Sequence, residues 1–96
     1  MNFQFRRPSG LPEAMRRQIR CARRSHLLSQ EVLGERLGVP QAHLSMIETG
    51  RGLPRAETLL DLARLLDLEL VLVPRSLAPA VAALIEQGSA PEEDEG

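Results

Sequence analysis

The chain has 96 residues, a length that suits one small domain and leaves no room for separate cofactor and substrate domains. Hydrophobic residues make up 43% and charged residues 26%, as in an ordinary globular protein. The net charge of −1 does not exclude a polyanionic partner, because residues 1–25 carry seven Arg against one Glu whereas residues 86–96 carry five acids and no base.

The first 11 residues predict an N-terminal arm, in which Phe3 and Phe5 alternate with polar residues before Pro8 interrupts the pattern. A helix is predicted over residues 12–26, because apolar residues recur there at helical spacing. Arg20 and Arg23 form a separate stripe on this helix, which we interpret as a solvated face. Arg6 and Arg7 in the arm are candidates for a contact with phosphate or the minor groove.

Three further helices are predicted over residues 30–37, 40–49 and 55–66. Ser29 is expected to cap the first of them, since its hydroxyl can accept a bond from an early N–H group. Gly38 suits a left-handed residue just past the end of that helix. Pro40 suits the first position of the next helix, where its missing N–H would have been unpaired anyway.

After these helices the pattern becomes that of a β-strand over residues 68–73, which is stopped by Pro74. Both faces of the strand are mostly apolar, and a lone strand leaves its N–H and C=O groups unpaired. It therefore needs a partner, either residues 2–6 or a second copy of the chain. Residues 77–87 predict a short amphipathic helix, and residues 88–96 a solvated acidic tail without order. The predicted domains are the arm (1–11), the helical domain with its strand (12–75), and the short helix with the tail (76–96).

The most informative spacing lies between Gln30 and Ile47. A tight helix-turn-helix needs a small residue inside its first helix, a turn residue that tolerates positive φ, and aliphatic residues on its second helix. Counted from Gln30, these positions are the fifth, ninth, fifteenth and eighteenth. They hold Gly34, Gly38, Leu44 and Ile47.

With these positions in place, the chain resembles the lambda-repressor-like, Xre-type helix-turn-helix family. The resemblance is carried by SQEVLGERLGV and IETGRGLPRAETLLDLA and covers about residues 12–73. It implies an all-α bundle of four to five helices with one C-terminal β-strand that pairs in a homodimer, and recognition helices that read an inverted-repeat operator in double-stranded DNA.

The extension LELVLVPR, together with the N-terminal arm, is similar to HipB-type antitoxins. This narrower resemblance implies a repressor that regulates its own operon and holds a HipA-like kinase toxin. Two departures from the wider family stand out: Gly34 replaces its usual Ala, and Pro40 replaces a Ser or Thr whose hydroxyl could reach a phosphate.

The family pattern also indicates which residues touch DNA. Base contacts are expected from Gln41, Ala42, His43, Ser45 and Met46. Gln41 can make a bidentate contact with adenine, and Ala42 and Met46 can meet thymine methyl groups. Phosphate contacts are expected from Gln30, Thr49, Arg51 and Arg55.

Two structural roles complete the predicted site. Glu48 is expected to accept bonds from the following turn or from an Arg. The residues of the strand are expected to form the dimer interface, namely Leu68, Leu70, Val71, Leu72 and Val73.

Other functions are disfavoured by the residues the chain lacks. Cys21 is alone, so no intrachain disulfide can form, and the two His show no metal-ligand spacing. We see no apolar run near the ~20 residues of a membrane span, no signal peptide, and no nucleophile–base pair. We therefore expect a cytoplasmic, nucleoid-associated protein that is not an enzyme and uses no cofactor or metal. A stand-alone regulator and a protein-binding adaptor or regulatory subunit remain as alternatives.

Overall fold

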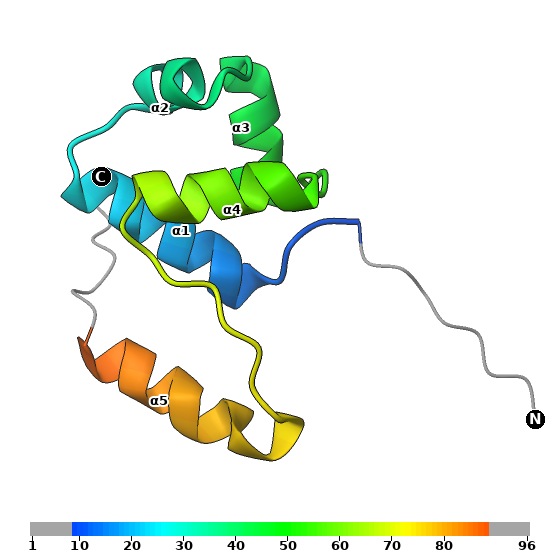
Figure 1. Cartoon of the computed structure of the whole chain (residues 1–96), viewed down its shortest axis with the longest axis vertical. Helices are drawn as coiled ribbons and strands as arrows, with labels where there is room; N and C mark the ends of the chain where they lie inside the picture. Colours follow the sequence, from blue (N-terminus) through cyan, green and yellow to red (C-terminus); the bar gives the residue numbers. More distant parts are fainter. Residues whose placement is uncertain (1–8, 89–96) are drawn as a thin grey trace, which may run out of the picture.

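The structure is a computed structural model that describes residues 9–88. Within this range it contains five α-helices and a single 3-10 turn, and no strand (Figure 1). The helices are α1 (Glu13–Ser25), α2 (Gln30–Leu37), α3 (Gln41–Thr49), α4 (Ala56–Leu65) and α5 (Ala78–Gly88), and the 3-10 turn η1 is Arg75–Leu77. The prediction of an all-helical domain is confirmed for this part of the chain.

Helices α1 to α4 form one bundle around a small aliphatic core. Each contributes at least one buried side chain, and α2, α3 and α4 supply the most completely buried ones. Full burial of one aliphatic side chain stabilises a fold by roughly 1.5–3 kcal/mol. The buried cluster is Leu11, Ile19, Leu33, Leu44, Ile47, Leu62 and Leu66.

Both ends of α2 lie where the sequence predicts them. The Ser29 hydroxyl accepts the N–H of Val32 at 3.0 Å, which is the predicted cap. Gly38 follows the helix with φ 76°, so its predicted left-handed conformation is also confirmed. The Val39 N–H donates to the carbonyl of Gly34 at 2.9 Å. This turn brings the chain sharply into α3.

The close approach of α2 and α3 occurs at Gly34, which is buried. A Cβ atom built on Gly34 would stand 2.8 Å from the carbonyl oxygen of Val39, so the glycine lets the turn fold back onto α2. A side chain there would force the backbone of the turn to shift.

The predicted strand over residues 68–73 is not formed in the described part of the single chain. These residues belong to a loop between α4 and η1 (Figure 1). Leu72 in this loop is 99% exposed. A strand is defined by its ladder of hydrogen bonds, and none of residues 9–88 provides a second strand. Residues 2–6, the intramolecular candidate, lie outside the described residues, as do the rest of residues 1–8 and the acidic tail.

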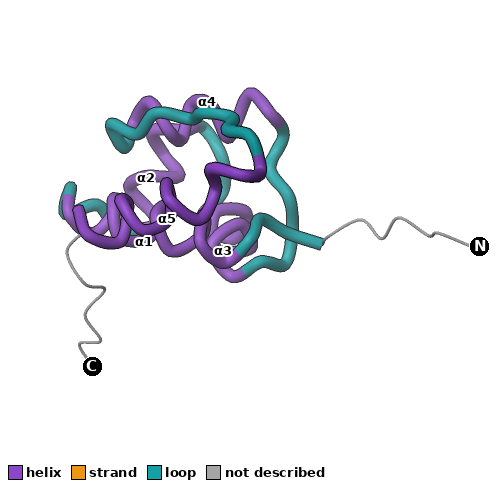
Figure 2. The backbone as a smooth tube through the Cα atoms, turned by 90° about the horizontal axis from the view of Figure 1, so that it is seen from below, coloured by secondary structure: helices purple, strands orange, loops and turns teal. Residues whose placement is uncertain are grey.

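Helix α5 lies beside α1, on the side away from α2 and α3 (Figures 1 and 2). It contributes no buried side chain. An ion pair between Arg17 Nη1 and Glu86 Oε2, at 3.2 Å, links it to α1. The bundle of α1 to α4 therefore carries the core, and α5 is an attachment to it.

Candidate nucleic-acid interface

Helix α3 presents one face to the core and one to solvent. The buried residues Leu44, Ile47 and Glu48 define the inner face. At about 100° per residue, the next five positions around the helix span an arc of about 140° that begins about 20° from Glu48. We call this arc the reading face, and it comprises Gln41, Ala42, Ser45, Met46 and Thr49.

Most of the residues predicted to touch bases lie on the reading face. Gln41 and Ala42 are exposed, Ser45 is partly exposed, and Met46 is 42% exposed. The Met46 Cε atom lies over Gly52, where an added Cβ would stand 3.2 Å away. The turn that follows α3 therefore orients the Met46 side chain.

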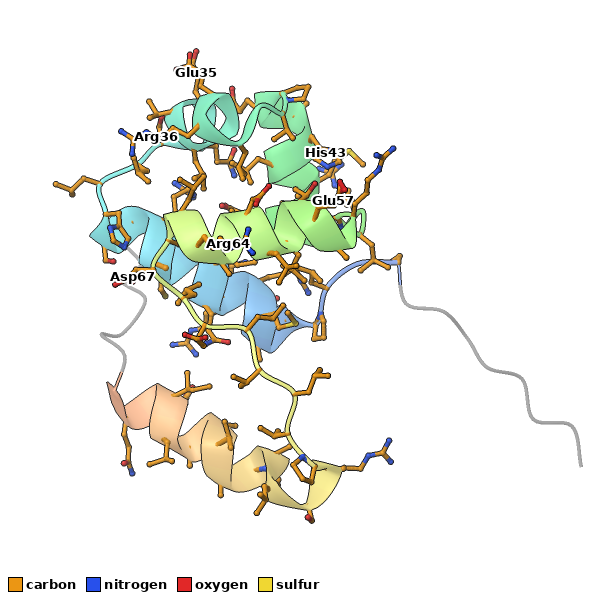
Figure 3. The ribbon with its side chains drawn as sticks, viewed as in Figure 1. Glu35, Arg36, His43, Glu57, Arg64 and Asp67 are labelled. Atoms are coloured by element: carbon orange, nitrogen blue, oxygen red, sulfur yellow. The ribbon has the colours of Figure 1, made fainter. Side chains whose placement is uncertain are left out.

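His43 is the exception among the predicted base-contacting residues. It lies about 60° beyond Met46 around the helix, outside the reading face, and is partly exposed, as Ser45 is. Figure 3 labels it on α3. A contact from His43 would therefore come from the rim of the interface.

Two of the predicted phosphate-contacting residues already have partners within the protein. Gln30 donates from Nε2 to Glu48 Oε1 at 3.0 Å, and its Oε1 lies 3.5 Å from Gln41 Nε2. The Thr49 hydroxyl donates to the carbonyl of Ser45 at 2.8 Å, within α3. These side chains are positioned by the protein before any ligand arrives.

The two predicted arginines lie in the connection from α3 to α4. Arg51 follows the left-handed Gly50, and its backbone N–H donates to the Met46 carbonyl at 2.9 Å. Arg55 is the residue before α4. Both side chains are exposed, and among residues 9–88 neither has an ion pair. Both are exposed positive groups in the connection that follows α3.

Behind the reading face lies a buried ion pair. Glu48 is 2% exposed, and its carboxylate accepts two bonds from one guanidinium: Arg23 Nε donates to Oε2 at 2.7 Å and Arg23 Nη2 donates to Oε1 at 3.0 Å. Arg23 also donates to the carbonyl of Leu28 at 3.0 Å, so one side chain joins α1, the α1–α2 connection and α3. The expected role of Glu48 as an acceptor for an Arg is confirmed.

The interpretation of Arg20 and Arg23 as a solvated face is wrong. The side chain of Arg23 is only 11% exposed and that of Arg20 only 20%. Arg20 donates to the backbone carbonyl of Glu48 at 3.0 Å and to Glu13 Oε2 at 3.2 Å. The polar stripe of α1 predicts exposure to solvent, but Arg20 and Arg23 instead face the C-terminal end of α3.

The region that builds this interface matches a known family. A family model described as helix-turn-helix matches residues 19–73, more than half of the chain. The chain belongs to the helix-turn-helix family. The matched residues include the turn at Gly38, the reading face and the buried Glu48.

A relative of this helix-turn-helix protein is an uncharacterised HTH-type transcriptional regulator, y4dL, of Sinorhizobium fredii. The two are 42% identical over 78 residues, which is 81% of this chain and 40% of the relative. The chain thus spans about two fifths of the length of the relative that it matches. No solved structure matches it.

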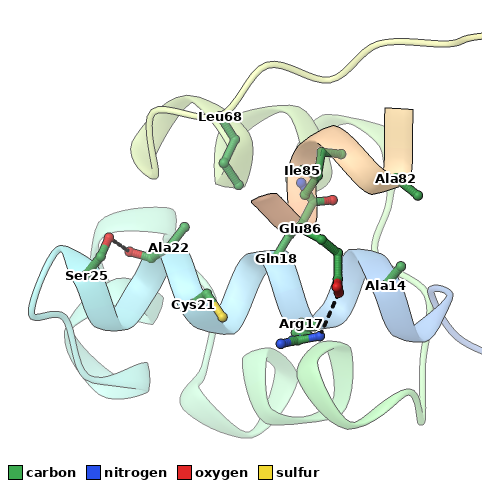
Figure 4. Close-up of a pocket in the computed structure, with 10 residues that line it drawn as sticks. All are labelled: Ala14, Arg17, Gln18, Cys21, Ala22, Ser25, Leu68, Ala82, Ile85 and Glu86. Carbon is green, nitrogen blue, oxygen red and sulfur yellow. Dashed lines mark hydrogen bonds and ion pairs between the residues drawn. The ribbon is translucent and has the colours of Figure 1, made fainter. Parts of the chain in front are cut away.

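The helix-turn-helix bundle also carries a groove away from the reading face. It lies between α1 and α5, has a volume of about 500 Å³, and is lined by apolar side chains such as Ala22, Leu68 and Ile85, with Cys21 and Arg17 along α1 (Figure 4). Residues 9–88 contain no cluster of three metal-ligating side chains. None of the helices in that range has the length and apolar character needed to cross a bilayer.

Proposed function

We propose that this chain is a sequence-specific DNA-binding repressor that inserts α3 into the major groove of an operator. The reading face of α3, with the Gln41 amide exposed at its start, is the observation that carries the proposal. Gln41 would contact an adenine edge, and Ala42 and Met46 the methyl groups of thymines.

Backbone contacts would fix the register of α3 on the duplex. Arg51 and Arg55 are exposed beside the reading face and carry the positive charge that a phosphate requires. Gln30 retains a second N–H on its Nε2 atom, which can donate to a phosphate while the first N–H stays on Glu48. Thr49 lies at the C-terminal end of the same face.

The test is a selection of binding sites from random double-stranded DNA with the full chain, followed by affinity measurements on the enriched sequence. The proposal expects an enriched motif, tighter binding to it than to a scrambled duplex, and a loss of preference at one base pair in Gln41→Ala. The matched control is Gln18→Ala, on the side of α1 that lines the α1–α5 groove. No enrichment, or an unchanged motif in Gln41→Ala, would overturn the proposal.

We further propose that the chain acts as a homodimer on an inverted repeat. Residues 70–73 present four exposed apolar side chains, with Leu72 almost fully exposed, and their backbone needs a partner strand. This segment connects to α5, which lies on the opposite side of α1 from α2 and α3 (Figure 1). Dimerisation there would leave both reading faces open, and two half-sites would lie about 34 Å apart.

The narrower hypothesis of a HipB-type antitoxin rests on the resemblance in LELVLVPR and on the groove between α1 and α5, which offers a protein partner a surface away from DNA. Its test is affinity capture of the chain from its native host. Recovery of a kinase-like partner encoded by the neighbouring gene is expected, and its absence from the capture would leave a stand-alone regulator.

A further inference from the structure

A shallow apolar pocket lies where residues 68–70 pass over α1 and α4. It has a volume of about 70 Å³, and its apolar walls are Met15, Ile19, Leu59, Leu62, Leu68 and Leu70. Leu70 is 43% exposed, and Leu72, two positions further along the segment, is 99% exposed. We call this pocket and the exposed side chains of Leu70 and Leu72 the apolar trough. Within residues 9–88 both of these leucines are left open to solvent.

The two aromatic side chains of the protein lie outside the described core. The sequence contains two Phe, at positions 3 and 5, and no Trp or Tyr. The buried cluster of α1 to α4 is accordingly aliphatic throughout. Phe3 and Phe5 are separated by the polar Gln4, so both would point to the same side of an extended chain. Exposure of such large apolar groups to water is unfavourable, so we expect them to cover an apolar surface.

The arm that carries these side chains joins the bundle close to the trough. Leu11 belongs to the buried cluster, and Met15 and Leu68 of the trough pack against that cluster. Leu11 and Met15 are four positions apart, so the arm leaves the bundle beside the trough wall. An extended chain advances about 3.3 Å per residue, so the four steps from Ser9 back to Phe5 span about 13 Å. This length brings Phe5 within reach of the wall.

We propose that residues 2–6 pair as a β-strand with residues 68–73 of the same chain and seat Phe3 and Phe5 in the apolar trough. Cross-strand neighbours on one face of a sheet pack against each other, which would set both rings against the leucines of the trough. The pairing would also satisfy the backbone groups on one edge of residues 68–73. The second edge stays available for the proposed dimer, and the inference does not depend on base reading by α3.

Amide hydrogen exchange of the full chain tests the pairing. The N–H groups of successive strand residues point to opposite edges, so the arm should protect one alternate set of amides in residues 68–73. We expect this set to exchange at least about tenfold more slowly than in an isolated peptide of the same sequence, at every protein concentration. The double variant Phe3→Ser/Phe5→Ser should return its rates to the peptide value. The core of α1 to α4 uses neither side chain, so this variant keeps its fold.

The matched control is Asn2→Ser/Gln4→Ser, which alters the alternate positions of the same arm and should leave the protection unchanged. The pairing is refuted if no set of amides is protected in the unmodified chain, or if the protected set keeps its slow rates in Phe3→Ser/Phe5→Ser. Equal losses in the two double variants would also refute it, since only one face of the arm is assigned to the trough.

A single tryptophan gives a second readout, because the chain contains none. Phe5→Trp should emit at a shorter wavelength than Gln4→Trp and be less accessible to an added quencher, since only position 5 is assigned to the trough. Adding Leu70→Ser removes part of the trough wall and should shift the emission of Phe5→Trp towards that of Gln4→Trp. Identical spectra for Phe5→Trp and Gln4→Trp would contradict the proposal.

Other partners of the arm give different results in the same measurements. Both are made without DNA, so they remain decisive even if the chain selects no operator sequence and the proposed function fails. Burial of position 5 that appears only after duplex DNA is added would place the arm on DNA and overturn the pairing. Burial that appears only as the protein concentration rises would place the arm on a second copy of the chain, and would overturn it as well.

Discussion

The guanidinium of Arg16 covers Gly50: a Cβ atom built on this glycine would stand 2.9 Å from Cζ of the arginine. Arg16 is held there by a bond from its Nε to the carbonyl of Leu11 at 2.9 Å and by an ion pair with Glu13 at 3.0 Å. Gly50 has φ 80° and ends α3. The start of α1 and the end of the reading helix are thus joined through a residue that has no side chain.

Substitution of the two left-handed glycines by alanine should therefore have unequal effects. Gly38 has φ 76° and nothing within 4 Å of an added Cβ, so Gly38→Ala should lower the free energy of unfolding by about 1 kcal/mol, through backbone strain alone. Gly50→Ala should cost about 2 kcal/mol, because Arg16 must also give up a hydrogen bond. Urea denaturation measures both, and equal losses would contradict the role of Arg16.

Leu27 offers a stabilising substitution. It connects α1 to α2 with φ 57°, a strained conformation for leucine, and its side chain is 91% exposed and so contributes little packing. Leu27→Gly should raise the free energy of unfolding by about 1 kcal/mol. Asp67 has φ 58°, and Asp67→Gly is the control with a smaller gain, since aspartate tolerates this region better. A Leu27→Gly protein that melts at or below the temperature of the unmodified chain would exclude the strain.

The cap of α2 should be measurable against a neighbouring serine. Ser29→Ala removes the acceptor of the Val32 N–H and should cost about 1 kcal/mol in thermal or urea unfolding. Ser25→Ala removes a hydroxyl that donates to the Ala22 carbonyl within α1, and should change stability by less than about 0.5 kcal/mol. Similar losses from both variants would show that the cap contributes nothing specific.

The phosphate contact of Arg51 should appear in the salt dependence of DNA binding. Arg51→Ala should reduce the slope of log affinity against log salt concentration by about 0.9 per chain, because one fewer counterion is released. Arg64→Ala is the control: this exposed arginine lies on α4 and pairs with Asp61 at 3.0 Å. An unchanged slope in Arg51→Ala would remove Arg51 from the interface.

The proposed strand pairing between chains should depend on backbone N–H groups in residues 68–73. Val71→Pro removes one of them from the middle of the segment, so sedimentation should show monomers where the unmodified chain is a dimer. Val71→Thr keeps the N–H group and a β-branched side chain, and should remain dimeric. A dimer that persists in Val71→Pro would rule out pairing through this segment.

The elements that sequence predicted well are governed by local rules. The bounds of α2, the Ser29 cap and the left-handed Gly38 each depend on residues no more than four positions apart. The neighbouring helices α3 and α4 begin one residue later than predicted, because Pro40 and Arg55 precede them as caps. Sequence alone does not show whether a residue such as Pro40 is the N-cap or the first residue of the helix.

The exposed residues of the candidate site were predictable from the sequence, whereas the buried pair behind them was not. The spacing from Gln30 to Ile47 places Gln41 at the start of a reading helix, and its exposure agrees with that prediction. The contact between Arg23 and Glu48 joins residues 25 positions apart, and helical periodicity cannot show which neighbour a polar stripe faces. Glu48 directly follows the buried Ile47, and its own burial arises from the tertiary packing of α1 against α3.

The strand requires a second backbone segment for its hydrogen bonds, either residues 2–6 or another copy of the chain. Residues 68–73 have the composition of a strand, and the exposed side chains of residues 70–73 show that the bundle does not use them. Their interpretation therefore depends on what pairs with them, which no pattern within the segment specifies.

We expect α5 to detach locally at a lower free energy than the bundle of α1 to α4 needs to unfold. Both side chains of its ion pair to α1 are exposed, at 45% for Arg17 and 66% for Glu86, and such a pair contributes at most about 1 kcal/mol and less in high salt. Amide hydrogens of α5 should consequently exchange with solvent through local opening, long before those of α2 and α3. Such local opening should expose the face of α1 beneath α5 while the fold that presents Gln41 stays intact.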